Sequence, residues 1–182
     1  MLKRLFETLF AKDPAIDAGR ALYSAAVEQA RSKALYVDFA VPDTVEGRFE
    51  QVALHVYLIM RRLKGEAAAK QVSQCLFDAM FQNMDDSLRE MGVGVDMVGK
   101  KIRKLAENFY GRIAVYEKAL ADDAPDDALV SALSRNVYGR EDERAAAPFA
   151  DYVRKVEADL AGQPTARITG GIVVFPTPVH SS

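Results

Sequence analysis

The side chains that could carry acid–base, nucleophilic or metal chemistry are few in this sequence and lie far apart. His55 and His180 are the two histidines, and Cys75 is the single cysteine. A zinc site needs three or four protein ligands, which these residues cannot supply together. His55 also has no serine, cysteine or aspartate at a spacing that forms a recognisable triad. We therefore predict neither a catalytic site nor a metal site, and we interpret His55 as a histidine of the core or of a surface groove.

The acidic and glycine residues around position 90 do not change this conclusion. Asp85, Asp86 and Glu90 could bind a metal in a carboxylate helix bundle, but such bundles also need a Glu-x-x-His pair, which the sequence lacks. The glycines within 92–99 have neither the preceding strand nor the Gly-Lys-Ser/Thr ending of a phosphate loop. We expect these glycines to end one helix and to turn the chain into the next.

Hydrophobic periodicity predicts that helices position these residues. Apolar side chains recur every three or four residues in most of the chain. The segments that we expect to be helical are 14–33, one that is capped by Asp43 or Thr44 and runs to 64, 66–91, 98–120, 129–137 and 149–160. The segment 49–64 is apolar on several faces and should be central. Residues 35–41 alternate with a strand-like period, which we interpret as a helix end that runs into an extended, buried connection.

The predicted fold class is therefore all-α, an irregular bundle of about six or seven helices with an extended C-terminal tail. We expect residues 1–161 to form one helical domain. Residues 162–182 are rich in glycine, proline and threonine, and only 172–175 are apolar enough to dock.

Composition excludes several classes of function. Charged residues make up 27% and hydrophobic ones 49%, with a formal net charge of -2, so we expect no nucleic-acid partner. A single cysteine cannot form an intramolecular disulfide bond, so the chain is not a small secreted protein held together by disulfides. The N-terminal apolar run is interrupted by charges, which is untypical of a signal peptide, and no stretch reaches the ~20 apolar residues of a membrane span.

Two features indicate binding surfaces instead. On a helix, the N-terminal residues Leu2, Leu5, Phe6, Leu9 and Phe10 would share one face, which could touch a membrane or pack on the domain's own core. The basic run at 100–104 could contact an anionic membrane surface or could be a solvated face. Flexible methionines, which suit either an adaptable groove or ordinary core packing, gather around the expected turn between two long helices: Met80, Met84, Met91 and Met97.

Several segments of the chain together resemble the ubiquinol-cytochrome c chaperone family. The strongest is MF-x-x-MD-x-x-LRE-x-GVG at 80–94, followed by GKKIRKLAE at 99–107 and FYGR at 109–112. VPDTVEGRFE at 41–50 with Leu54-His55, and SRNVYG at 134–139, match further family segments. One departure is that Val95 stands where the family tends to place an acidic residue after its GVG, and Asp96 follows it.

The resemblance implies an assembly chaperone that holds newly made cytochrome b before its incorporation into the cytochrome bc complex, without turnover and with no cofactor. It also implies, in mitochondrial relatives, a small partner protein. This short chain looks like a bacterial version, so we expect it in the cytoplasm, with peripheral contact at the inner face of the cytoplasmic membrane.

The residues that we expect to be exposed contacts for the client or a partner are His55, Arg89, Lys100, Lys101, Arg103, Tyr110 and Arg112. Two alternatives stay open: a general helical protein-interaction module, and a small-ligand binder with a pocket near His55 and Tyr57.

Overall fold

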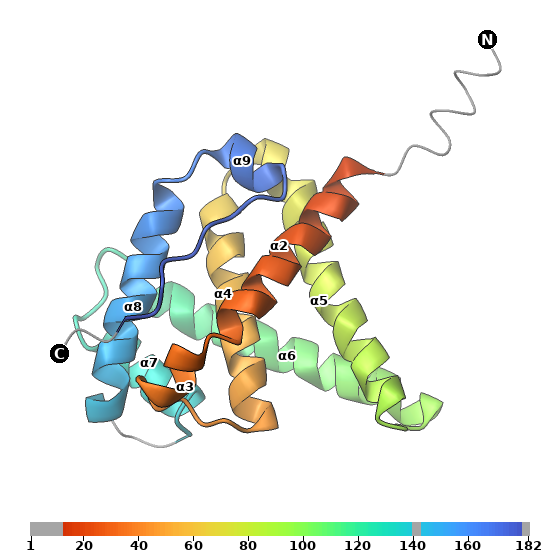
Figure 1. Ribbon diagram of the computed structural model, residues 1–182, viewed down its shortest axis with the longest axis horizontal. Coiled ribbons are helices and arrows are strands. Elements are labelled where there is room, and N and C mark those ends of the chain that lie inside the picture. Colours follow the sequence, from red (N-terminus) through yellow and green to blue (C-terminus); the bar gives the residue numbers. More distant parts are fainter. Residues whose placement is uncertain (1–12, 140–142, 180–182) are drawn as a thin grey trace, which may run out of the picture.

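The computed structural model describes residues 13–139 and 143–179, and the chain is all-helical within these ranges (Figure 1). The described residues form eight α-helices, six of them seven residues or longer, with one short 3-10 helix and no strand. The predicted all-α fold class is confirmed. The elements in chain order are α2 (Pro14–Ala30), α3 (Lys33–Val37), α4 (Val45–Leu63), η1 (Ala67–Ala69), α5 (Lys70–Glu90), α6 (Val95–Ala119), α7 (Ala128–Asn136), α8 (Glu143–Ala161) and α9 (Thr165–Thr169).

Helix α4 forms the centre of the core, as its apolar faces predicted (Figure 1). It begins where the Thr44 side chain accepts a hydrogen bond from the backbone nitrogen of Gly47 at 3.0 Å. Almost all of its middle third is buried, which is expected of a helix that is apolar on several faces. This burial also takes three polar side chains into the core: Glu50, Gln51 and His55.

Helix α2 crosses α5 at very short range. The Asp13 side chain caps α2 by accepting from the backbone nitrogen of Ala15 at 2.9 Å, and Pro14 is the first helical residue. At the crossing, a β-carbon added to Gly19 would lie 2.6 Å from the backbone carbonyl carbon of Cys75. Only a residue without a side chain lets the two helices approach this closely.

Helices α5 and α6 form a long antiparallel hairpin whose turn lies at one end of the molecule (Figure 1). The predicted glycine turn is confirmed: Gly92 has a positive φ of 76°, which glycine adopts without strain. Gly94 occupies the N-cap position of α6, and Asp96 lies inside the first turn, where no side-chain cap bond forms. Asp96 therefore acts only through its charge near the positive end of the helix dipole.

Several of the expected helix boundaries are wrong, among them the start of α8, which lies at Glu143 and not at 149. Helix α2 ends at Ala30, and 33–37 forms the separate helix α3 in place of an extended connection. Leu35 and Phe39 are buried while Val37 between them is 62% exposed, so the alternation reflects helical i, i+4 spacing and not a strand. Helix α5 starts at Lys70 and not at 66, because Gly65 has a φ of 86° and Glu66 is extended.

The C-terminal segment is more structured than the sequence predicted. It contains α9, and residues 172–179 then run back along the body beside α8 (Figure 1). Val173 and Phe175 pack against the core, while Ile172 and Val174 are more than half exposed. Gln29 on α2 fixes this segment by donating to the carbonyl oxygen of Pro176 at 2.8 Å.

The expected N-terminal amphipathic face at 2–10 and His180 lie outside the described residues. No helix in the described ranges combines the length and the apolar character needed to cross a bilayer.

The close approach of α2 and α5 can be tested by substituting Gly19 at the crossing and a second glycine away from it. Gly19→Ala should lower the free energy of unfolding by about 1–3 kcal/mol, because the new methyl group meets the backbone of α5. Gly111→Ala is the matched control: it lies in α6 with nothing within 4 Å, so it should raise the stability by about 1 kcal/mol. Urea denaturation followed by circular dichroism measures both. A Gly19→Ala protein as stable as the wild type would contradict the close approach.

Candidate functional site

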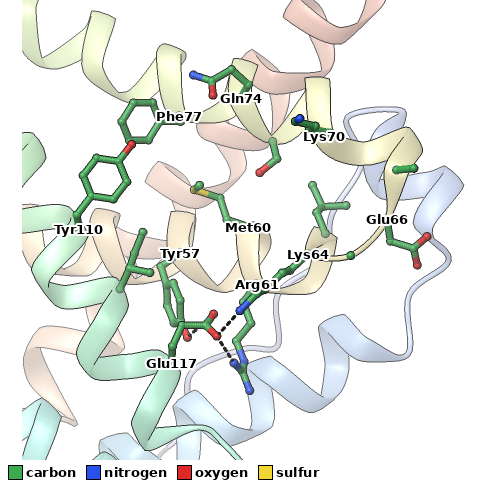
Figure 2. A pocket seen from close by; sticks show the side chains of 15 residues that line it. Tyr57, Met60, Arg61, Lys64, Glu66, Lys70, Gln74, Phe77, Tyr110 and Glu117 are labelled. Atoms are coloured by element: carbon green, nitrogen blue, oxygen red, sulfur yellow. Dashed lines mark hydrogen bonds and ion pairs between the residues drawn. The ribbon is translucent and has the colours of Figure 1, made fainter.

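A groove of about 500 Å³ lies between the C-terminal half of α4, the α4–α5 connection, the first half of α5 and the second half of α6. We call it the α4–α6 groove (Figure 2). Its lining is predominantly apolar, with charged residues along one edge. The lining residues are Tyr57, Met60, Arg61, Leu63, Lys64, Gly65, Glu66, Ala67, Lys70, Ser73, Gln74, Phe77, Tyr110, Ile113 and Glu117.

Aromatic rings form one end of this groove. The ring centroids of Phe77 and Tyr110 lie 5.7 Å apart, and Figure 2 shows the two rings side by side across α5 and α6. Phe77 also lies near Phe81 at 4.5 Å and Phe109 at 5.9 Å, so the wall is backed by a continuous aromatic cluster. Tyr110 is 57% exposed and therefore presents its ring to an incoming partner.

Charged side chains form the opposite end. Glu117 accepts from Arg61 Nη1 at 3.1 Å and from Lys64 Nζ at 2.8 Å (Figure 2). The Tyr57 hydroxyl donates to the same carboxylate at 3.3 Å. Lys70 also lines the groove and has no ion-pair partner among the described residues. Within the described part of the chain, the rim thus carries three cations against two carboxylates, and one of the cations is unpaired.

The ionisation of these groups suits binding and not proton transfer. Burial, with the nearby Glu117 charge, raises the pKa of Tyr57, so its hydroxyl stays protonated at neutral pH. Burial alone would raise the pKa of Glu117, but the hydrogen bonds and charges of Lys64 and Arg61 outweigh it and lower that pKa. Neither group titrates near pH 7, as a general acid or base would. The described residues also contain no group of three or more side chains placed to hold a metal ion.

The structure brings one of the expected contact residues, Tyr110, into the α4–α6 groove. The basic run lies on the same helix nearer the hairpin turn, with Lys100, Lys101 and Arg103 all exposed. It lies beyond the end of the groove, since Arg103 and Tyr110 are seven residues or about 10 Å apart along the helix axis. Arg89 is exposed on α5 and pairs with Asp85 one turn earlier.

Arg112 corrects an expectation, because it is not a free surface residue. Its guanidinium pairs with the carboxylate of Glu50, which is only 5% exposed, and the Arg112 side chain itself is about three-quarters buried. Burial raises the pKa of Glu50 although the Arg112 hydrogen bond and charge act against it. Arg112 is therefore committed to joining α6 to α4.

His55 corrects the same expectation more strongly, because it is fully buried. Its Nδ1 lies 2.7 Å from the carbonyl oxygen of Gln51, which can only accept, so Nδ1 carries the proton. Its Nε2 lies 3.0 Å from the hydroxyl of Tyr152, and the ring of Phe175 meets it edge-on at 5.3 Å. His55 is thus a satisfied core histidine. Burial lowers its pKa to about 4, against a weaker opposing effect of the Gln51 hydrogen bond.

The alternative pocket shared by His55 and Tyr57 does not form. The two residues are two positions apart on the same helix, so their side chains are turned about 200° around its axis and point in nearly opposite directions. Tyr57 lines the α4–α6 groove, whereas His55 faces α8 and the C-terminal segment.

The methionines divide between core and surface. Met80 is fully buried, while Met91 and Met97 are exposed at the hairpin turn. Met60, which the sequence patterns did not single out, lines the groove, as do Lys70 and Ile113. Only one weak feature of the sequence indicates this groove. Phe77 and Phe81 lie beside the main apolar stripe of their helix, which is typical of a second, partly covered face.

Comparisons with known proteins give a consistent result. A family model described as ubiquinol-cytochrome C chaperone matches residues 37–175. The chain is 28% identical over 137 residues to ubiquinol-cytochrome c reductase complex assembly factor 1 of Mus musculus, over 74% of this chain and 46% of that protein. The same factor from Xenopus laevis is 27% identical, over 74% of this chain and 68% of its own length. The chain thus spans about half the length of the mouse relative.

A solved structure agrees over nearly the whole chain. The crystal structure of the Cbp3 homolog from Brucella abortus superimposes with a TM-score of 0.82 at 34% identity, covering 98% of both chains.

Because His55 is buried and neutral in the folded protein, its protonation in mild acid should lower the free energy of unfolding. The unfolded histidine has a pKa near 6.5 and the folded one about 4, so the unfolded chain takes up the proton first. Stability is then lost as the pH falls through 6.5 towards 4, by about 2 kcal/mol between pH 7 and pH 5. His55→Gln should not show this loss of stability between pH 7 and pH 5, because glutamine takes up no proton. Urea unfolding of both proteins at each pH measures it, and a pH-independent difference between them would contradict a neutral buried His55.

Proposed function

The chain belongs to the ubiquinol-cytochrome C chaperone family, and on that premise we propose that it assists the biogenesis of the ubiquinol-cytochrome c reductase (cytochrome bc) complex. We propose newly made cytochrome b as its client. The family is one of chaperones and not of enzymes, which confirms the prediction from the sequence that the chain is not an enzyme.

The observation that carries the proposal is the α4–α6 groove, an apolar surface with cations on its rim. A client that has not yet joined its complex exposes apolar segments that water would drive into aggregates. The aromatic end of the groove, with Phe77, Tyr110 and Ile113, can cover part of such a segment. Lys64 and Lys70 can bind carboxylates or free carbonyl oxygens beside it.

The size of the groove limits what it can hold. A membrane-spanning helix is about 30 Å long, and a groove of about 500 Å³ accepts only side chains from one or two of its turns. Contacts must therefore extend beyond the groove. We propose that they continue along α6 to Arg103, which faces nearly the same way as Tyr110, and to Lys100, and then across the hairpin to Arg89. Lys101 points about 180° away from Tyr110 and lies outside this path.

A pair of substitutions on α6 tests the groove as the client site. Tyr110→Glu places a charge on the exposed aromatic wall and should reduce the recovery of cytochrome b about thirtyfold, because loss of a central aromatic contact typically costs about 2 kcal/mol or more. Val115→Glu is the control. Val115 is also exposed on α6 but points about 140° away from Tyr110, and it does not line the groove. Its recovery of cytochrome b should stay within about twofold of the wild type.

The measurement is an affinity pull-down from solubilised membranes of the native organism, with the tagged chain as bait and mass spectrometry as readout. Enrichment of cytochrome b without the mature complex is the expected result, and a small second protein in the same fraction would identify the partner subunit that the resemblance implies. Equal recovery by both variants would reject the groove. A reproducible partner without cytochrome b would favour the general interaction module instead.

A further inference from the structure

A second groove, of about 710 Å³, lies at the other end of α5 from the first. The two grooves share no residue: α5 gives the first groove Lys70, Ser73, Gln74 and Phe77, and it gives the second Asn83, Met84 and Ser87. We call the second one the α2–α3 groove. The rest of its lining comes from α2, α3 and the start of α4: Tyr23, Val27, Ala30, Arg31, Lys33, Tyr36, Val37, Asp43, Arg48, Phe49 and Val52.

The inner surface of this groove is apolar. Phe49, Val52 and Met84 are partly buried side chains that pack against the core and leave one side open, and the half-buried Val27 lies beside them in the groove. The two tyrosines beside them have their hydroxyl protons in use. Tyr23 donates to Asn83 at 2.9 Å, and Tyr36 donates to the carbonyl oxygen of Ala30 at 2.6 Å. These tyrosines therefore offer mainly their rings to a ligand.

Cations gather on one side of the groove only. Burial raises the pKa of Tyr36. The charges of Arg48 and Arg31 oppose this effect, and the carboxylate of Asp43, the partner of Arg48, adds to it. Lys33 lies on the same side, whereas the wall from α5 offers the neutral Asn83 and Ser87. An anion near the Tyr36 hydroxyl would meet positive charge from α2, α3 and α4 at once.

This positive charge is available to a ligand. Arg31 and Lys33 have no ion-pair partner among the residues that the structure describes. Arg48 binds Asp43 at 2.6 Å, but both side chains are more than half exposed, and such surface pairs stabilise a protein very little. A phosphate can therefore replace the Asp43 carboxylate as the partner of Arg48.

We propose that the α2–α3 groove binds an anionic phospholipid at a membrane surface. Its phosphate lies between Arg31 and Arg48, and its acyl chain lies against Phe49, Val52 and Met84. An apolar trough with cations at one edge matches a linear molecule that has one anionic end. Val37 lines the same groove and is 62% exposed, so it adds apolar surface at the point where the bilayer would meet the protein. The inference does not depend on the client of the chaperone.

The absence of tryptophan from the sequence allows a site-specific test. Val37→Trp places the only fluorophore of this kind in the α2–α3 groove, and Ile172→Trp is the control, because Ile172 is 54% exposed and does not line that groove. Vesicles of phosphatidylglycerol should shift the emission of Val37→Trp to shorter wavelength and leave Ile172→Trp unchanged. Vesicles of phosphatidylcholine, and inorganic phosphate alone, should shift neither. An equal shift with phosphatidylcholine, or a full shift with phosphate alone, would overturn the proposal.

Charge removal tests the phosphate site in the Val37→Trp protein. Arg31→Gln with Arg48→Gln should weaken binding to phosphatidylglycerol vesicles about thirtyfold, as expected for two basic residues at a membrane surface. Lys155→Gln with Arg167→Gln removes the same charge from exposed positions on α8 and α9 and should change binding less than about twofold. Equal weakening by both pairs would mean that only net charge matters and would reject the site. Thermal unfolding of each variant checks that the fold is intact. Binding of an acidic amphipathic peptide in preference to the vesicles would reject the lipid and assign the groove to a protein partner.

Discussion

The burial of helix α4 is the constraint on which the rest of the structure depends, because this helix carries polar side chains into the core. An unsatisfied buried polar group costs about 1–3 kcal/mol, and a buried charge without a partner costs more. Glu50 is met by Arg112 from α6, and His55 is met by Tyr152 from α8. Tyr152 in turn accepts from Gln29 on α2 at 2.7 Å. These partners of α4 thus come from two other helices, α6 and α8, and Gln29 links the second of them to α2. The positions of these helices are fixed by hydrogen bonding as well as by packing. Gln51 is the exception, since neither of its amide atoms has a partner among the described residues.

The α4–α6 groove follows from the same constraint. Arg112 holds α6 against α4, so Tyr110 and Ile113 stand at a set distance from Tyr57 and Met60 on the facing helix. The Arg61–Glu117–Lys64 cluster closes the other end, and Arg61 also binds Glu157 of α8 at 2.6 Å. The groove is therefore a preformed gap between packed helices. A preformed surface loses little conformational entropy on binding, which suits a protein that must hold an apolar segment without chemistry.

The two proposed binding surfaces lie at different ends of α5. The α4–α6 groove is proposed to hold an apolar client segment, and the α2–α3 groove to hold an anionic lipid. Both are apolar troughs with cations along one side. They differ in how far these cations are paired: Glu117 neutralises much of the rim of the first groove, whereas Arg31 and Lys33 of the second have no ion-pair partner within the described residues. A chaperone with both surfaces would keep its client beside the membrane that the client must enter.

The amino-acid sequence by itself determined the all-α class, the central helix, the glycine turn and the exposure of Tyr110 and the basic run, because helical periodicity and glycine conformation act over a few residues. The family resemblance was also legible from short motifs. Only the tertiary structure decided which polar residues are contacts and which are core. The sequence left His55 open between core and surface groove and favoured an exposed Arg112, because their partners Tyr152 and Glu50 lie 97 and 62 residues away. The same holds for the grooves, whose walls come from helices distant in sequence. Periodicity shows which face of a helix is apolar, but the distance between two helices is set by packing around α4, and that distance decides whether an apolar face is filled or left open.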